Sequence, residues 1–89
     1  MELQVNGIPV YYEKRGRGCP VVLLHGNGGS HHTFDGLMEK LAVAYTVYAP
    51  DSRGHGKSGK AGPLSYEQLA SDTAALIQAL GLEKPMLYG

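Results

Sequence analysis

The sequence predicts an α/β fold with a mostly parallel sheet and an antiparallel hairpin at its N-terminal end. Two alternating apolar runs flank Asn6-Gly7, and a buried-type run follows at Val21–Leu24. From there the order strand, helix, strand, helix, strand predicts parallel pairing through crossover helices. Glycine supplies 13 of the 89 residues, about twice its ordinary share, and clusters between the apolar segments. We therefore expect about five strands, two helices and glycine-bearing turns.

Residues 2–6 and 8–14 are expected to form the hairpin. Apolar and polar residues alternate on both sides of Asn6-Gly7, and this dipeptide favours the positive φ angles of a two-residue hairpin turn. Pro9 has no N–H to donate, so we expect its nitrogen to face away from the neighbouring strand.

Residues 20–24, 45–49 and 86–88 are short apolar runs that end at a glycine-bearing loop or at the chain end. Such runs are typical of strands buried on both faces of a parallel sheet. A first helix is predicted between the first two, with Ser30 as its cap and one apolar stripe from Phe34 to Ala42.

A second helix is predicted to begin after Ser65. Gln68 would complete a capping box with Ser65, and Leu64 with Leu69 would form a hydrophobic staple. Gly81 is expected to end this helix. Its buried face is predicted to comprise Tyr66, Leu69, Ala70, Thr73, Ile77 and Leu80.

Composition argues against several classes of protein. The net charge is zero, which disfavours a nucleic-acid partner. No basic stretch leads into an apolar run at the start, so no signal peptide is expected. The longest apolar run, Val21–Leu24, is far too short to span a membrane. The single cysteine, Cys19, excludes an internal disulfide framework and favours a reducing, cytoplasmic location.

The loops after the strands are where such sheets bind ligands, but cofactor motifs fit them poorly. Gly26-Asn27-Gly28 begins like a dinucleotide fingerprint, yet His31 occupies the third glycine position. Gly56-Lys57-Ser58 resembles the end of a phosphate-binding P-loop, yet Asp51 stands where its first glycine should be. Pro63 also opposes the helix that a P-loop lysine opens. No cofactor is expected.

Metal and nucleophile interpretations are equally weak. The four histidines form no H-x-x-x-H pair and have no carboxylates arranged around them, so no metal site is expected. Ser58, His55 and Asp51 would be a conceivable triad, but near neighbours on one glycine-rich loop lack the fixed geometry that activates a nucleophile. Cys19 is interpreted as a tolerated free thiol.

One chemical interpretation suits the loop after residues 20–24. Backbone N–H groups there could donate to a developing oxyanion, because Gly26, Gly28 and Gly29 leave room and Asn27 adds a donor without bulk. A tight glycine turn between a strand and a helix explains the same spacing. The residues alone leave both interpretations open.

Three stretches and the predicted helix from Ser65 together resemble the N-terminal part of an α/β-hydrolase-fold enzyme, in order and in spacing. The stretches are Leu23–Ser30, Tyr48–Ser58 and Lys84–Gly89. The D-x-R-G-x-G-x-S pattern at 51–58 is the most specific of their motifs. The resemblance implies that Asn27 and Gly28 belong to the oxyanion-hole loop. It also implies that 51–58 forms a structural turn at the rim of the site. His25 would organise a loop rather than act as the catalytic base.

The same resemblance identifies Gly89 as the first glycine of the nucleophile elbow, with the nucleophile, acid and base further along the family's chain. Residues 1–89 are thus expected to be a partial domain that is inactive alone. The expected function is the N-terminal segment of a serine-type hydrolase of an ester, amide or related carbonyl substrate. A non-catalytic hydrolase-fold binding or interaction module is the alternative.

The family's strand order would place residues 20–24 between 45–49 and 86–88, with the two helices on opposite faces. Five strands span roughly 20–24 Å, whereas one helix covers about 10 Å. Each face would then be half bare, and the last strand would be an unprotected edge. We expect the chain to need a complementary chain or self-association. A small-molecule substrate is expected only for the complete enzyme.

Overall fold

The N-terminal hairpin consists of β1 (Glu2–Val5) and β2 (Ile8–Arg15), as predicted. The computed structural model describes residues 1–25, 29–59 and 65–88. Asn6 and Gly7 have φ angles of 48° and 82°, which are the positive values that a two-residue hairpin turn requires. The carbonyl of Pro9 accepts a hydrogen bond from the Gly59 N–H at 2.7 Å. The backbone of Pro9 therefore faces away from β1, which confirms the prediction for its nitrogen.

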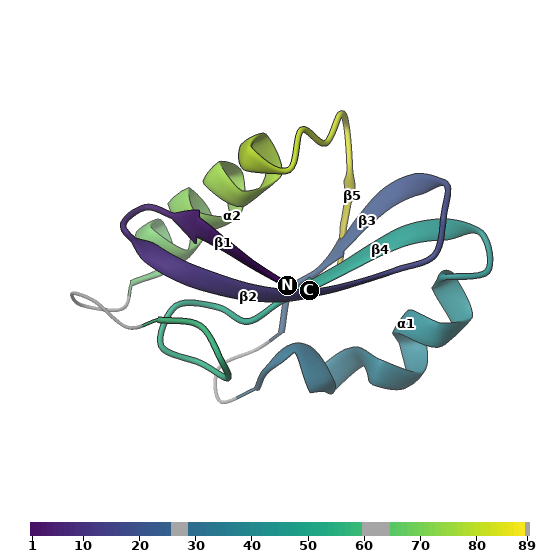
Figure 1. Cartoon of the computed structure of the whole chain (residues 1–89), viewed down its shortest axis with the longest axis horizontal. Coiled ribbons are helices and arrows are strands. Elements are labelled where there is room, and N and C mark those ends of the chain that lie inside the picture. The colour runs from purple at the N-terminus through teal and green to yellow at the C-terminus, as the bar shows by residue number, and fades with distance from the viewer. Residues whose placement is uncertain (26–28, 60–64, 89) are drawn as a thin grey trace.

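The five strands form one sheet in the order β1-β2-β4-β3-β5 (Figure 1). β3 (Cys19–Leu23) pairs in parallel with β4 (Tyr45–Pro50) and with β5 (Met86–Tyr88), whereas β2 and β4 pair antiparallel. β3 thus lies between β4 and β5, as the resemblance implied.

The first helical segment differs from the single helix predicted, because it starts as a short 3-10 turn, η1 (His31–Phe34), before α1 (Asp35–Leu41). Ser30 is its cap, as predicted. The His32 N–H donates to Ser30 Oγ, and the Ser30 N–H donates to Thr33 Oγ1, both at 3.2 Å. This reciprocal pair satisfies two backbone donors at the start of the turn.

The second helix, α2 (Tyr66–Ala79), begins and ends where predicted. The Gln68 N–H donates to Ser65 Oγ at 3.1 Å. The Gln68 side chain bonds to Asp72 rather than returning to Ser65, so only half of the predicted capping box forms. Gly81 follows the helix with φ 69°, a left-handed conformation that favours glycine. Leu64 lies outside the described residues, and so does the predicted staple.

The buried face of α2 is shifted from the predicted one. Ala70 is exposed, and the residue that enters the core is Leu76, which packs against Val5, Ile8 and Val10 of the hairpin. Positions 70 and 76 lie about 120° apart around a helix. The hairpin therefore selects the side of the helix that carries Leu76. Leu69, Thr73, Ile77 and Leu80 of the predicted face are half-buried, and the side chain of Tyr66 is not described.

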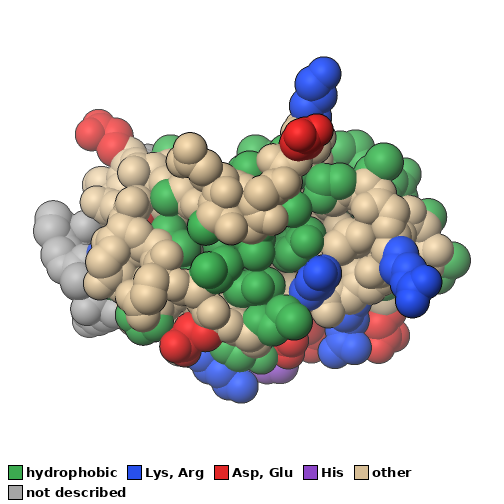
Figure 2. Space-filling view, turned by 45° about the horizontal axis from the view of Figure 1, so that its top comes forward, with side chains coloured by type: hydrophobic (Ala, Val, Ile, Leu, Met, Phe, Trp, Pro, Cys, Tyr) green, Lys and Arg blue, Asp and Glu red, His purple; other side chains and the backbone are tan. Residues whose placement is uncertain are grey.

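α1 and α2 lie on opposite sides of the sheet, as predicted (Figure 1). On the α1 side of the sheet, Met38 of α1 packs against Val21, Leu23, Val47 and Ala49. On the α2 side, the sheet presents Tyr12, Val22 and Tyr48, which half-buried leucines border. Figure 2 shows hydrophobic side chains gathered on this side, where α2 covers the sheet only in part.

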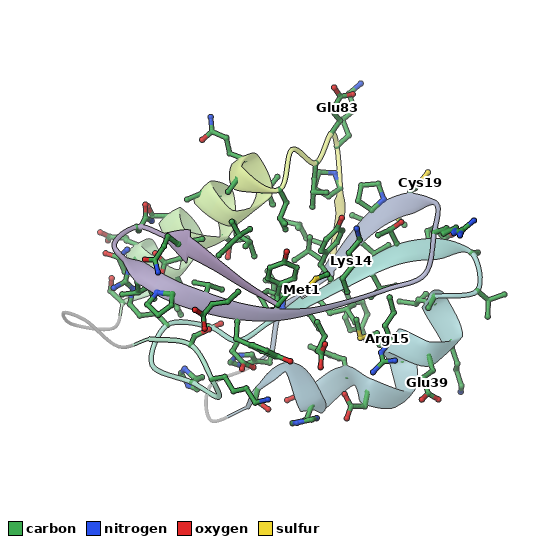
Figure 3. The ribbon with its side chains drawn as sticks, viewed as in Figure 1. Met1, Lys14, Arg15, Cys19, Glu39 and Glu83 are labelled. Atoms are coloured by element: carbon green, nitrogen blue, oxygen red, sulfur yellow. The ribbon has the colours of Figure 1, made fainter. Side chains whose placement is uncertain are left out.

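β2 and β5 show how far the two helices cover the sheet. At the end of β2, Lys14 points to the α2 side and Arg15 to the α1 side (Figure 3). Lys14 Nζ lies 5.8 Å from the ring centroid of Tyr48. At β5 neither helix gives full cover, because Met86, Leu87 and Tyr88 are all more than half exposed.

Candidate active-site edge

The carboxyl ends of the three parallel strands meet at one edge of the sheet, where ligands bind in folds of this class. The Leu24 N–H, just past β3, donates to the carbonyl of Tyr88 in β5 at 2.7 Å. Asp51 follows β4 directly at the same edge. The predicted oxyanion residues Asn27 and Gly28 lie outside the described residues, so their assignment stays a prediction.

The segment 51–59 is built around the carboxylate of Asp51, which is fully buried. Its Oδ2 accepts the Lys57 N–H at 2.7 Å. Ser58 Oγ donates to the carbonyl of Asp51 at 2.5 Å and accepts the Tyr11 N–H at 2.9 Å. Gly56 has φ 51°, and a Cβ there would overlap the Asp51 carboxylate. The segment is therefore a structural turn fastened to β2, as the resemblance implied.

These contacts exclude both a nucleophilic triad and a phosphate-binding P-loop in the segment 51–59. Ser58 Oγ donates to a backbone carbonyl, and His55 Nδ1 lies 3.0 Å from the carbonyl oxygen of Arg53. Ser58, His55 and Asp51 thus do not form a nucleophilic triad. Lys57 Nζ lies 4.7 Å from the ring centroid of Tyr11, and the lysine does not open a helix as a P-loop lysine would.

An ion pair that the sequence reasoning missed ties this turn to α2 and to the hairpin. Arg53 Nε and Nη2 donate to the two carboxylate oxygens of Asp72 at 2.9 and 3.0 Å. Nη2 also donates to the carbonyl of Asn6 at 3.2 Å. The Arg53 and Asp72 side chains are only 6% and 10% exposed. A signal existed in the sequence: Asp72 stands between Leu69 and Leu76 on the buried side of its helix, where a lone charge needs a partner.

The hydrogen bonds decide the charge state of this pair. Burial by itself would raise the pKa of Asp72, but hydrogen bonds from Arg53, Asn6 and Gln68 and the guanidinium charge outweigh it. The pKa of Asp72 therefore lies below its usual 3.8. The hydrogen bonds to Asp72 also raise the pKa of Arg53. Both groups are charged near neutral pH, so the pair is a cross-link rather than an acid–base couple.

The same region holds a small cavity of about 20 Å³ between the end of β4 and α2. Its wall combines the apolar side chains of Leu24, Leu69 and Leu76 with the polar groups of Asp51 and Asp72. Such a volume holds about one water molecule. Within the described residues this cavity is too small to accept an organic substrate.

His25 connects the segment after β3 to the turn after β4, in agreement with a loop-organising role. Its Nε2 accepts the backbone N–H of Ser52 at 2.9 Å. Its ring lies 5.1 Å from that of His55, with the two planes tilted by 56°. His32 instead pairs with Asp35 on the exposed surface. Among residues 1–25, 29–59 and 65–88, no cluster of three or more histidine, cysteine or carboxylate side chains could hold a metal ion.

A mixed sheet with helices on both faces, and with strand-end loops held together at one edge, defines an α/β protein of the open-sheet class. The family model described as alpha/beta hydrolase fold matches residues 20–89. The chain belongs to the α/β-hydrolase-fold family.

Individual relatives agree with this assignment. The chain is 35% identical over 91 residues to a soluble epoxide hydrolase from Corynebacterium sp. (strain C12). The aligned region covers 99% of this chain and 31% of the relative. It superposes on an esterase from Exiguobacterium antarcticum with a TM-score of 0.90 and 34% identity, covering 97% and 33% of the two chains. An epoxide hydrolase from Vigna radiata superposes with a TM-score of 0.92 and 28% identity, covering 98% and 30%.

The chain thus spans about a third of the length of these relatives. Within its described part, no helix combines the length and apolar character that crossing a membrane demands. Cys19 is exposed and forms no disulfide.

Proposed function

We propose that residues 1–89 form the N-terminal part of a serine-type hydrolase that cleaves an ester, amide or related carbonyl substrate. The observation that carries the proposal is the carboxyl edge of the sheet, where the Ser52 N–H donates to His25 Nε2 and so joins the segments after β3 and β4, and where the Asp51 carboxylate holds the second segment in a turn. A rigid edge of this kind supports a reaction site, because catalytic groups must be held in fixed geometry. Membership of a hydrolase-fold family, with an esterase among the similar structures, supports the same activity.

In this proposal the chain contributes part of the oxyanion hole, through the backbone N–H groups of Asn27 and Gly28. The serine nucleophile, the histidine base and the acid that orients it come from the remainder of the enzyme. Donors aimed at the oxyanion stabilise the tetrahedral transition state more than the substrate, and losing one costs about 2.7–4 kcal/mol. The 89-residue chain alone is inactive, because it holds only this supporting part of the site.

The exposed parts of the sheet are covered either by the remainder of the enzyme, which a complementary chain supplies, or by a second copy of this chain through self-association. β5 supports this part of the proposal, since its three side chains are apolar and more than half exposed. Strands in parallel sheets are ordinarily covered on both faces. The unpaired Cys19 favours a reducing compartment and hence a cytoplasmic location.

Labelling with a fluorophosphonate, which reacts with activated serines, tests the activity. The full-length protein that carries residues 1–89 should be labelled and should hydrolyse a short-chain aryl ester, and both should be lost together on pretreatment with the reagent. The 89-residue chain is the matched control and should show neither. Ester turnover by the 89-residue chain above a heat-treated control would overturn the assignment of roles.

A second candidate, epoxide hydrolysis, is favoured by the similarity to the epoxide hydrolases of Corynebacterium and Vigna radiata. The two activities separate in one experiment. Conversion of an aryl epoxide to its diol, with no fluorophosphonate labelling, would replace the serine-type proposal by this one. Absence of both reactions in the full-length protein would favour the non-catalytic binding module.

A further inference from the structure

The contact between His25 and Ser52 joins two segments that are 27 positions apart in the sequence. His25 lies two positions past the end of β3, and Ser52 lies two positions past the end of β4. The two strands are parallel neighbours, so their register alone fixes how far their ends are apart. It does not fix the direction in which the chain leaves β3. The hydrogen bond fixes that direction, because it ties a side chain after β3 to the backbone after β4.

The Ser52 side of this bond is well anchored. The preceding Asp51 N–H donates to the carbonyl of Tyr11 at 2.8 Å, and its side chain is buried in the turn. On the following side, Arg53 is held by the bidentate pair with Asp72. The Ser52 amide is therefore a fixed donor between two fixed residues, and His25 is the partner that adapts to it.

The chemistry of the bond sets the state of the imidazole. A backbone N–H can only donate, so Nε2 of His25 accepts and carries no proton. In the neutral ring the proton is then on Nδ1. The ring of His55 packs against that of His25, and its own Nδ1 faces the carbonyl oxygen of Arg53. That oxygen accepts only, which places a proton on Nδ1 of His55.

We infer that His25 is a positioning residue, which as a neutral imidazole fastens the segment after β3 to the turn after β4 through the Ser52 amide. The catalytic consequence rests on the proposed function, because that proposal places oxyanion donors directly after His25. A displacement of about 1 Å in such donors costs about 100-fold in rate. The fastening itself does not depend on any activity.

Two variants separate the acceptor from the bulk of the side chain. His25→Leu keeps an apolar group of similar size and removes the acceptor, whereas His25→Gln offers an amide oxygen at a reach similar to that of Nε2. His32→Leu is the matched control, since His32 is an exposed histidine whose partner, Asp35, lies three residues away in its own helical segment. All are made in the full-length protein that carries residues 1–89.

Amide exchange measured by NMR reads the fastening directly. In His25→Leu the Ser52 amide should exchange at least tenfold faster, while the neighbouring Asp51 amide, held by Tyr11, should keep its protection. A general loss of stability would speed both amides alike. His25→Gln should restore slow exchange at Ser52, and His32→Leu should not alter it. The ¹⁵N shift of His25 Nε2 at neutral pH should be that of an unprotonated nitrogen.

Kinetics then test the catalytic consequence. His25→Leu should lower kcat for the ester by about 100-fold with little change in KM, and His25→Gln should remain within a few-fold of the original enzyme. Unchanged Ser52 exchange in His25→Leu or a protonated Nε2 would each overturn the fastening, and full kcat in His25→Leu would overturn its catalytic consequence. A protein that shows the Ser52 effect but neither ester nor epoxide turnover would overturn the proposed function and leave the fastening role of His25 supported.

Discussion

Gly56 offers the sharpest test of how the turn after β4 is built. Its φ of 51° is a left-handed conformation, and a Cβ at this position would overlap the carboxylate of Asp51. Replacing Gly56 with alanine should therefore lower the free energy of unfolding through two separate effects. The left-handed conformation costs an L-residue about 1–2 kcal/mol. Displacing the Asp51 carboxylate breaks its charge-assisted bond to the Lys57 N–H, which is worth about 1.5–3 kcal/mol.

Gly56→Ala should thus lower the free energy of unfolding by about 2.5–5 kcal/mol. Gly81→Ala is the matched control, because Gly81 shares the left-handed conformation, with φ 69°, but a Cβ there meets nothing within 4 Å. That variant should lose about 1 kcal/mol, since the stiffer unfolded chain offsets part of the strain. Gly36, inside α1 and equally open, should tolerate alanine with a gain of about 0.5–1 kcal/mol.

Urea unfolding of the full-length protein, followed by circular dichroism, measures these differences, provided that the slope of each transition stays unchanged. The comparison that decides is Gly56→Ala against Gly81→Ala, because backbone strain cancels between them. A difference below about 1 kcal/mol would refute the idea that the Asp51 carboxylate occupies the space beside Gly56 and holds the turn.

Two further predictions concern the ion pair and the core. Because hydrogen bonds hold the pKa of Asp72 below 3.8 in the folded state, its contribution to stability is present above about pH 4 and is lost as the pH falls through the folded pKa. Asp72→Asn should remove that part of the pH dependence in acid urea titrations, whereas Glu67→Gln, on the exposed surface of α2, should leave it intact. Met38→Ala should cost about 2–5 kcal/mol in thermal or urea unfolding, because Met38 is 2% exposed beneath the sheet. Val43→Ala, at a residue that is 88% exposed, should stay within about 0.5 kcal/mol, and equal effects of these two variants would contradict the assigned core.

The elements that the sequence predicted well are those specified by local chemistry. Asn6-Gly7 dictated a positive-φ turn, and short apolar runs gave β3, β4 and β5 to within one or two residues. Ser30 and Ser65 marked helix starts because a hydroxyl that caps a backbone N–H acts over two or three residues. The strand order followed from the family resemblance rather than from any local pattern.

What the sequence did not predict depends on partners distant along the chain. The buried side of α2 was misplaced toward Ala70 because the hairpin, not the helix, determines that Leu76 faces the core. Gln68 was assigned to Ser65, yet Asp72 one turn further on competes for its side chain. No sequence pattern around His25 or around Ser52 indicates the hydrogen bond between them. Asp72 alone carried an overlooked signal, as a charge on an otherwise buried stripe.

The position of β3 in the sheet has a consequence for how the chain is made. Both neighbours of β3, namely β4 and β5, are synthesised after it. When β3 has left the exit tunnel and residues 45–50 are still inside it, neither hydrogen-bonding edge of β3 is occupied, and its apolar side chains lack the helices that later cover them. The hairpin can close at once because its partners are adjacent, whereas β3 must wait for later strands to arrive. Nascent chains of this protein should therefore recruit chaperones at the stage when β3 is outside the exit tunnel and β4 is not.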